Sequence, residues 1–418
     1  MPPSVLPAAV RDVDQPWLTV IGVGEDGFAG LSAAARQVLA RAERLVGGAR
    51  HLALIPDDSA PGAQRHAWPS PMLPFLDVVA SWRGAAVVVL ASGDPLLYGV
   101  ASTLLSRIDR GEMAVLPSVS AFQLACAAMV WPATETRLVS ACGRPIEALA
   151  LELYDGARVV LYSADGATPA AAAALLVSQG CGASRMTVLE RLGSPEARSV
   201  SLAAHDVGDR RFAPLNTVAI EIVAGPAHRP LPRIAGLPDD SFDHDGQITR
   251  REIRALTLAR LAPTPGALLW DVGAGSGSIG IEWMRAAPGA HAIALEPRAD
   301  RAARIRATAR RLGVPGLDLR EARAPEGLAG LPRPDAVFLG GGATAPGVLD
   351  IAWAALKPGG RLVANAVTLE TEAVLLKARE ALGAELTRLQ IAHADPVGRM
   401  TGWRPTMPVT QFVATKPR

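Results

Sequence analysis

Three glycines at alternating positions, Gly273, Gly275 and Gly277, follow a largely apolar run at residues 268–272. Because glycine has no Cβ, a loop of this kind lets the backbone approach a ligand closely. The next apolar run ends on Glu296, 23 residues after Gly273, where a carboxylate can accept hydrogen bonds from both hydroxyls of a ribose. The spacing therefore predicts a site for a cofactor that contains a nucleoside.

The glycine spacing also distinguishes a site for a dinucleotide from a site for S-adenosylmethionine. A dinucleotide fingerprint reads GxGxxG/A, whereas here the third glycine comes one residue early and is followed by Ser278. Asp271, two residues ahead of the first glycine, is expected either to orient the loop or to meet the ammonium group of a methionine moiety. We interpret the loop, with Ala274 and Ser276 between its glycines, as a site for S-adenosylmethionine.

A second glycine-rich segment lies near the N-terminus. Gly22, Gly24 and Gly27 match the dinucleotide spacing after an apolar run, but such a match alone is weak evidence. We expect a helix over residues 31–46, followed by Gly-Gly-Ala-Arg at 47–50, which offers no acid for a ribose. The second half of the dinucleotide pattern is therefore missing.

Two further buried runs in this half end in polar turns. The first ends at Ser92, Gly93 and Asp94, and the second leads to Ser120, which can cap the helix that it opens. Loops at the ends of buried strands are where α/β proteins bind ligands. Asp94 could instead be a turn former ahead of Pro95, and the sequence leaves both roles open.

The elements that position these loops alternate short β-branched runs with Ala/Leu/Arg-rich helical stretches, which predicts α/β folds in both halves. Residues 224–236 interrupt the alternation with three prolines and two glycines. We therefore expect one module at residues 1–225, a linker at 226–236 and a second module at 237–418. A softer break at 131–136 divides the first module into two lobes.

Composition limits the classes of function. The 418 residues carry a net charge of only +2, which does not favour a nucleic-acid partner. No apolar run reaches the length of a membrane span, and Met1 to Val20 lacks the pattern of a secretory leader, so we expect a cytoplasmic protein. The three cysteines form no CxxC pair and the seven histidines are scattered, so no metal site or catalytic triad is expected.

The C-terminal half resembles the decarboxylating precorrin methyltransferases of cobalamin synthesis. The segments that carry the resemblance are 249–254, 271–277, 324–326, 340–342 and 365–371. The resemblance implies a class I Rossmann-like fold, methylation of the macrocycle at carbon 15 and loss of carbon dioxide from the ring C acetate. The implied cofactor contacts are Thr249, Gly273, Ala274, Gly275, Ser276, Gly277, Glu296 and Ala324, and Asp271 joins them as a candidate on its position ahead of the first glycine.

The N-terminal half resembles the tetrapyrrole methylases, in particular the branch that methylates precorrin at carbon 5. Segments 22–24, 87–99, 116–123 and 141–145 carry this resemblance. The family has a two-lobed fold that holds S-adenosylmethionine in the cleft between its lobes. The wider family often has Pro-Gly-Asp after the first glycines, where this chain has Glu-Asp-Gly at 25–27. The implied cofactor contacts are Gly22, Gly24, Ser92, Gly93, Asp94, Tyr98, Ser120 and Asn216.

Together the two halves resemble the family of fused precorrin-6Y C5,15-methyltransferases (decarboxylating), which implies one S-adenosylmethionine per module and a tetrapyrrole substrate. We expect a homo-oligomer. The alternatives are a nicotinamide-dependent oxidoreductase, an RNA or DNA methyltransferase and a regulator that binds S-adenosylmethionine without turnover. The residues considered for binding the substrate are Arg144, Arg191, Asn365, Arg399 and Arg404.

Overall fold

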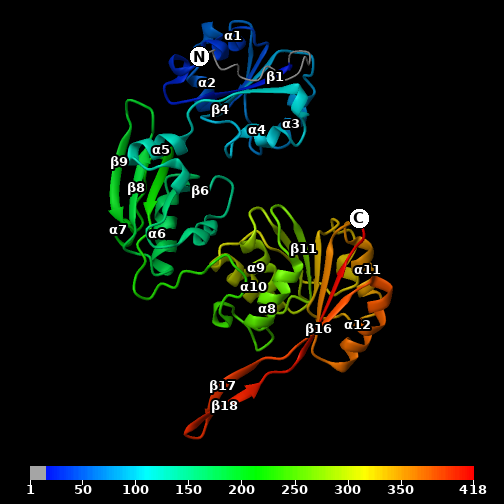
Figure 1. Cartoon of the computed structure of the whole chain (residues 1–418). Helices are drawn as coiled ribbons and strands as arrows, with labels where there is room; N and C mark the ends of the chain where they lie inside the picture. The colour runs from blue at the N-terminus through cyan, green and yellow to red at the C-terminus, as the bar shows by residue number, and fades with distance from the viewer. Residues whose placement is uncertain (1–15) are drawn as a thin grey trace, which may run out of the picture. The chain divides into compact units, whose positions relative to one another are not determined.

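The computed structural model describes residues 16–418 (Figure 1). Most of the stretch from Met1 to Val20, on which the expectation about a leader depends, lies outside these residues. The chain divides into two compact units. The first contains Met1–Ile146 and Tyr154–His228, and the second contains Glu147–Leu153 and Arg229–Arg418.

The first lobe of the N-terminal unit is built on a parallel five-stranded sheet in the order β3-β2-β4-β1-β5. The central strands are buried along nearly their whole length because their Val, Leu and Ile side chains pack against helices on both faces. The elements are β1 (Leu18–Val23), α1 (Ala33–Ala40), β2 (Arg44–Gly47), α2 (Ala49–Ala53), β3 (Gln64–Ala67), α3 (Phe75–Ala80), β4 (Val87–Ser92), α4 (Val100–Leu104) and β5 (Met113–Leu116).

The helix expected over residues 31–46 is shorter than predicted. Helix α1 ends at Ala40, and β2 begins only four residues later at Arg44. Leu45 and Val46 are fully buried in the sheet, where β2 pairs with β4. The sheet contacts of these two side chains therefore outweigh the helical tendency of the preceding residues, which sequence periodicity alone could not show.

The second lobe contains a mixed five-stranded sheet in the order β6-β7-β10-β8-β9. Strands β6 and β7 are parallel, whereas β10 pairs antiparallel with both β7 and β8. The elements are α5 (Ala121–Met129), β6 (Thr136–Ser140), β7 (Arg158–Tyr162), α6 (Thr168–Ser178), β8 (Arg185–Glu190), β9 (Arg198–Ala203), α7 (Ala204–Val207) and β10 (Asn216–Glu221).

The C-terminal unit contains a seven-stranded sheet in the order β13-β12-β11-β14-β15-β19-β16, in which β19 runs antiparallel to both of its neighbours. Helices α8 and α9 pack on one face and α11 and α12 on the other. The elements are α8 (Arg251–Leu261), β11 (Leu268–Val272), α9 (Ser278–Ala286), β12 (His291–Leu295), α10 (Ala299–Arg311), β13 (Asp318–Arg320), β14 (Ala336–Leu339), α11 (Val348–Ala355), β15 (Arg361–Ala366), α12 (Leu369–Leu382), β16 (Glu385–Leu389) and β19 (Val409–Thr415). The predicted α/β class and Rossmann-like order of this unit are confirmed.

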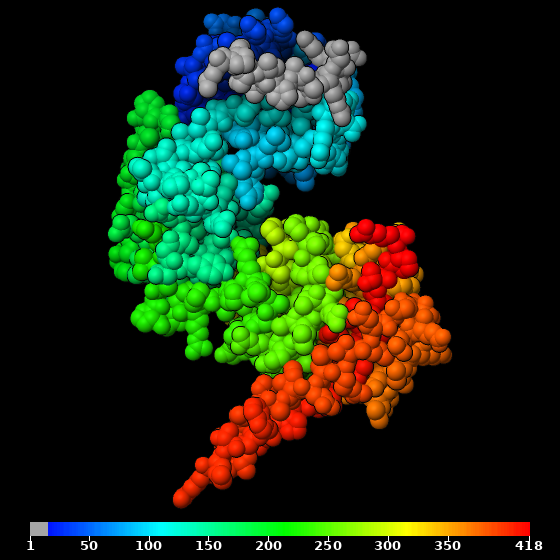
Figure 2. Space-filling model, in the orientation of Figure 1, coloured from blue at the N-terminus to red at the C-terminus, as the bar shows by residue number. Residues whose placement is uncertain are grey.

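A two-stranded hairpin, β17 (Ala392–Val397) and β18 (Met400–Pro405), projects from the C-terminal unit between β16 and β19 (Figure 2). Its side chains are mostly exposed, including Trp403 and Met400. Among the residues that the structure describes, no helix is long and apolar enough to cross a membrane.

Candidate active sites

The glycine loop of the C-terminal unit joins β11 to α9 in a conformation that requires glycine. Gly273, Gly275 and Gly277 have φ values of 72°, 60° and 70°, in the left-handed region. A Cβ on Gly273 would lie 2.8 Å from the backbone nitrogen of Gly341, and one on Gly277 would lie 2.7 Å from Cγ2 of Ile305. A Cβ on Gly275 would meet only the carbonyl oxygen of Gln247, at 3.6 Å. Of the three positions, Gly275 therefore has open space beside its Cα, although its φ still favours glycine.

Glu296 lies directly after β12 and holds this loop in place. One of its carboxylate oxygens accepts a hydrogen bond from the Gly275 backbone nitrogen at 2.9 Å, and the other accepts from the Arg298 backbone nitrogen at 3.1 Å. Each carboxylate oxygen can accept more than one hydrogen bond. Glu296 can therefore keep the loop in position and still accept hydrogen bonds from a ribose.

Asp271, the last but one residue of β11, is completely buried. Its Oδ2 accepts a hydrogen bond from the Gly280 backbone nitrogen of α9 at 3.0 Å, while its Oδ1 has no partner among the described residues. The pKa of this carboxyl is raised to about 7, mainly by burial; the Gly280 hydrogen bond opposes the rise and the charge of Glu296 adds to it. The contact with α9 favours the first of the two roles that we considered, orienting the loop.

A cavity of about 840 Å³ opens beside the glycine loop. Asp271, Ser276 and Gly277 are not in its lining. Ser276 is itself buried, and its hydroxyl has no partner among the described residues. The predicted residues that line the cavity are Thr249, Gly273, Ala274, Gly275, Glu296, Ala324 and Asn365.

The lining also contains positive side chains that the sequence analysis did not single out. Arg250 follows the predicted contact Thr249, and Arg323 precedes the predicted contact Ala324. Both arginines could therefore have been found from their position beside these residues. Arg298 and Arg301 pair with Asp245, with N–O distances of 3.6 Å and 2.9 Å, and Arg250 pairs with Asp239 at 3.4 Å. Arginine forks of this kind recognise carboxylates, so this wall of the cavity suits an acidic ligand.

The Thr249 side of the cavity is fixed by Arg254, a fully buried residue of α8. Its Nε donates to a Glu282 carboxylate oxygen at 2.6 Å, and its Nη1 donates to Asp239 at 3.0 Å and to the Thr249 carbonyl oxygen at 2.5 Å. The guanidinium also stacks on the Phe242 ring at 4.6 Å. A buried charge is stable only when its donors are satisfied, and here they bind both Glu282 of α9 and the segment that precedes α8.

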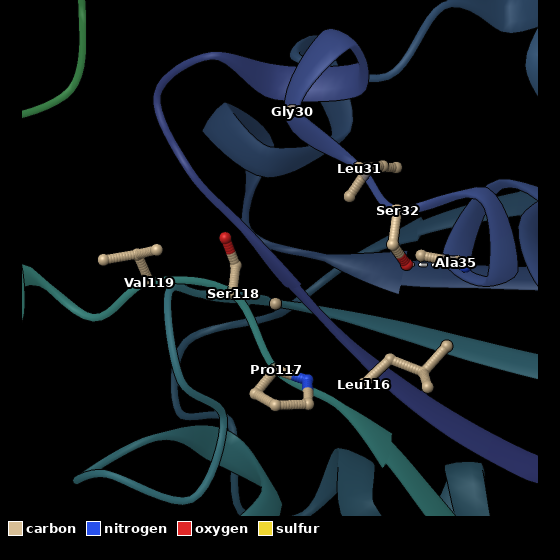
Figure 3. Close-up of a pocket in the computed structure, with 9 residues that line it drawn as sticks. Gly30, Leu31, Ser32, Ala35, Leu116, Pro117, Ser118 and Val119 are labelled. Atoms are coloured by element: carbon tan, nitrogen blue, oxygen red, sulfur yellow. Dashed lines mark hydrogen bonds between the residues drawn. The ribbon is translucent and has the colours of Figure 1, made fainter. Parts of the chain in front are cut away.

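In the N-terminal unit, the loops after β1, β4 and β5 contact one another through their backbones. The Gly93 nitrogen donates to the Val23 carbonyl at 3.1 Å, and the Ser118 nitrogen donates to the Gly93 carbonyl at 3.0 Å. A Cβ on Gly22 would lie 2.6 Å from the Ser118 nitrogen, so glycine is required for this close approach. A cavity of about 410 Å³ lies here, bounded by the start of α1 and by residues 116–119 (Figure 3).

Gly22 is the only predicted contact in that lining, and several others lie on the adjoining loops. Ser120 is buried and caps α5, its hydroxyl accepting from the Gln123 nitrogen at 3.2 Å, as its position in the sequence indicated. Asp94 Oδ1 accepts from the Leu96 nitrogen at 2.9 Å, which is the turn-forming role that the sequence left open. Contacts of Gly24, Ser92, Gly93, Asp94 and Ser120 with a cofactor stay predictions.

Three of the remaining N-terminal candidates come from different elements. Tyr98 has a φ of 55° and its ring lies 6.3 Å from that of Tyr162, while the Arg144 guanidinium stacks over Tyr98 at 4.8 Å. Asn216, at the start of β10, donates to the carbonyls of Asp165 and Ala213, and its own Oδ1 is buried without a partner among the described residues. Tyr98 and Arg144 therefore meet each other, whereas Asn216 anchors neighbouring backbone.

The other predicted substrate arginines are not brought to either cavity. Arg191 pairs with Glu196, and Arg404 on β18 lies 3.7 Å from Asp395. Arg399 is exposed at the turn between β17 and β18. In contrast, the Asn365 amide nitrogen donates to the Thr257 hydroxyl at 2.9 Å while the residue lines the larger cavity.

Two family profiles match separate parts of the chain. The tetrapyrrole (corrin/porphyrin) methylases match residues 18–206, and the precorrin methyltransferase domain matches residues 240–416. A full-length relative from Sinorhizobium sp., a precorrin-6Y C(5,15)-methyltransferase [decarboxylating], is 51% identical over 96% of this chain and 97% of its own. The chain belongs to this family. It is an S-adenosylmethionine-dependent C-methyltransferase, and the comparisons favour none of the three alternatives.

Shorter relatives of this methyltransferase correspond to parts of the chain. A cobalt-precorrin-7 C(5)-methyltransferase from Salmonella typhimurium is 32% identical over 43% of this chain and 88% of its own. A probable cobalt-precorrin-6B C(15)-methyltransferase (decarboxylating) from Pyrobaculum calidifontis is 30% identical over 42% of this chain and 95% of its own. The solved C-terminal domain of a precorrin-6Y C5,15-methyltransferase from Rhodobacter capsulatus is 46% identical, covers 44% of this chain and 100% of its own, and has a TM-score of 0.43.

Proposed function

We propose that this methyltransferase alkylates one precorrin macrocycle twice. The C-terminal module methylates carbon 15 and removes carbon dioxide from the ring C acetate, and the N-terminal module methylates carbon 5. The observation that carries the proposal is the relative that matches both modules over nearly their whole length. Relatives whose names specify carbon 5 or carbon 15 alone, each matching less than half of the chain, support a division of the chemistry between modules.

We further propose one S-adenosylmethionine per module, with the modules at residues 1–225 and 237–418. In the C-terminal cavity, Gly275 leaves a cradle that a side chain would fill, and Glu296 presents carboxylate oxygens beside it. The cofactor supplies an electrophilic methyl group. The proposed contacts on the N-terminal side are Gly22, Gly24, Ser92, Gly93, Asp94, Tyr98, Ser120 and Asn216.

The protein's part in such a transfer is mainly to hold donor and acceptor together and to exclude water. In the C-terminal cavity, Gly275 and Glu296 would orient the cofactor. Arg250 and Arg323 would bind carboxylates of the macrocycle, because they line the same cavity. We assign no residue as the acid or base of the decarboxylation.

We also propose that the protein is a homo-oligomer through the hairpin of β17 and β18. Met400 and Trp403 on this hairpin are 79% and 77% exposed, and Val397 is 61% exposed. Apolar side chains gathered on a projecting element favour association. Light scattering, which measures the mass in solution, tests this proposal. The intact protein should be an oligomer and Trp403→Ser should associate more weakly, whereas a monomeric wild type would contradict the proposal.

The function is tested with the intact protein, precorrin-6Y and S-adenosylmethionine that carries a trideuterated methyl group. Mass spectrometry should show two labelled methyl groups and the loss of one carbon dioxide per macrocycle. Binding of the cofactor without any labelled product would contradict the proposal and would indicate a regulator.

A further inference from the structure

Four polar side chains meet at the carboxyl edge of the first sheet, outside the cavity lining: Glu25, Arg50, His51 and Ser92. Glu25 follows β1, Arg50 and His51 belong to α2, and Ser92 ends β4. Arg50 Nη1 donates to Glu25 Oε1, and Arg50 Nη2 lies 2.9 Å from Ser92 Oγ and 2.9 Å from His51 Nε2. His51 Nε2 is itself 2.8 Å from Ser92 Oγ.

The chemistry of arginine fixes the direction of these hydrogen bonds. A guanidinium only donates, so His51 Nε2 is an acceptor and the ring is neutral. Burial, with the nearby charge of Arg50, lowers the pKa of His51 to about 4, which agrees with this protonation state. Arg50 and Ser92 share the single lone pair of His51 Nε2. Ser92 Oγ accepts from Arg50 with one of its two lone pairs, so the other lone pair can accept from a ligand.

The solvent exposure of the four residues differs in a way that allows Ser92 to contact a ligand while the other three hold Ser92 in place. Ser92 is exposed, whereas the Glu25 side chain is only 16% exposed and Arg50 and His51 are partly buried. Glu25 is also the first of the three residues, 25–27, at which this chain departs from the Pro-Gly-Asp pattern of the wider family. Its pairing with Arg50 gives that departure a physical role, because it ties the β1 loop to the residue that ends β4.

We propose that Glu25, Arg50 and His51 are positioning residues for the N-terminal cofactor site: they fix the Ser92 hydroxyl as a hydrogen-bond acceptor for a donor group of S-adenosylmethionine. This inference rests on the proposed function, in which Ser92 contacts the cofactor. None of the three supporting residues needs to touch the cofactor.

The test compares Arg50→Met, Arg50→Lys, Ser92→Ala and the double variant Arg50→Met/Ser92→Ala in the intact protein. For carbon-5 methylation, Arg50→Met should raise the KM for S-adenosylmethionine about tenfold with a much smaller change in kcat, as expected for a lost charge-assisted hydrogen bond. Arg50→Lys should have an intermediate effect, because a single ammonium cannot span Glu25 and Ser92 as a fork does. The double variant should be no worse than Ser92→Ala, since Arg50 acts through that hydroxyl.

Carbon-15 methylation and carbon dioxide release by the same molecules provide the internal control and should not change. Arg107→Met, which removes an exposed ion pair with Asp77, is the matched surface control for carbon-5 methylation. Additive effects of Arg50→Met and Ser92→Ala, or a raised KM for the tetrapyrrole alone, would overturn the inference. A wild-type protein that methylates carbon 15 but not carbon 5 would instead overturn the proposed function of the N-terminal module.

Discussion

Glu296 shapes the glycine loop, and we propose that the same carboxylate also binds the cofactor. Its carboxylate accepts from the backbone nitrogens of Gly275 and Arg298, and it borders the larger cavity. The position of this acid could be predicted from sequence, because it ends the second strand after the glycine loop. The hydrogen bond from the Gly275 nitrogen to this carboxylate could not be predicted, because it depends on how β11 and β12 pair.

Replacing Glu296 with Ala should therefore weaken S-adenosylmethionine binding at the C-terminal site by about 1.5–3 kcal/mol, the range for hydrogen bonds to a charged group. Calorimetric titration of the intact protein with S-adenosylmethionine measures the affinity of both proposed sites, and only the C-terminal site should bind more weakly. Glu326→Ala, at an exposed position near the predicted contact Ala324, is the control. Unchanged affinity in both classes would show that Glu296 serves the loop alone.

Asp271 predicts a pH dependence of stability. Its pKa rises from an ordinary value of 3.8 to about 7 on folding, so the folded chain keeps a proton that the unfolded chain has released. The folded state therefore loses stability as the pH rises from about 4 to about 7. Asp271→Asn cannot titrate, so its free energy of unfolding should exceed that of the wild type by more at pH 8 than at pH 5. Chemical denaturation at pH 5 and at pH 8 measures both free energies of unfolding. The same difference between Asp271→Asn and the wild type at the two pH values would contradict the prediction.

At the scale of elements, the glycine loop gives a sharper prediction than any single side chain. Gly275→Arg should abolish carbon-15 methylation and decarboxylation and spare carbon-5 methylation, because its side chain would enter the cavity. Gly383→Arg is a matched control, with a φ of 59° against 60° and no atom within 4 Å of the added Cβ. Product mass spectrometry with labelled methyl groups distinguishes the variants. Retained decarboxylation in folded Gly275→Arg would show that the chemistry lies elsewhere.

Gly24→Arg should have the opposite effect and remove carbon-5 methylation alone. A Cβ at Gly24 would lie 2.5 Å from Oδ1 of Asp26, so the loop would have to shift. Gly62→Arg, where nothing lies within 4 Å of an added Cβ, is the control in the same module. If Gly24→Arg also stopped carbon-15 methylation in a folded protein, the two modules would share an active site.

The elements also show where sequence reasoning succeeds and where it stops. The strand at Leu268–Val272 and the one at Arg361–Ala366 could be predicted because each apolar run begins just after a glycine turn. The strand at Arg44–Gly47 could not, because only its pairing with neighbours separates it from the preceding helix. The support of Ser92 by Arg50 was likewise hidden, since those residues are 42 positions apart.

At the scale of the whole molecule, we predict that the two modules work separately. Neither cavity is lined by residues from across the linker. A fragment from about Pro230 to Arg418 should methylate carbon 15 and release carbon dioxide, and a fragment ending near Gly225 should methylate carbon 5 only. Assays of the purified fragments with labelled S-adenosylmethionine check this. Two inactive but folded fragments would contradict it.

One structural detail modifies that prediction. Residues Glu147–Leu153 group with the C-terminal unit, where Glu152 pairs with Arg233 at 2.5 Å and Leu151 lies against Gly313. A fragment that starts at Pro230 loses these contacts. We therefore expect it to be active but less stable to heat than the same module in the intact chain.

We propose that one chain holds two independent S-adenosylmethionine sites. The number of cofactor molecules bound per chain, measured by calorimetry, tests this most directly. The intact wild type should bind two molecules of S-adenosylmethionine per chain, while Gly275→Arg and Gly24→Arg should each bind one. The double variant Gly24→Arg/Gly275→Arg should bind none. Saturation of the folded wild type at a single molecule per chain would contradict the presence of two sites.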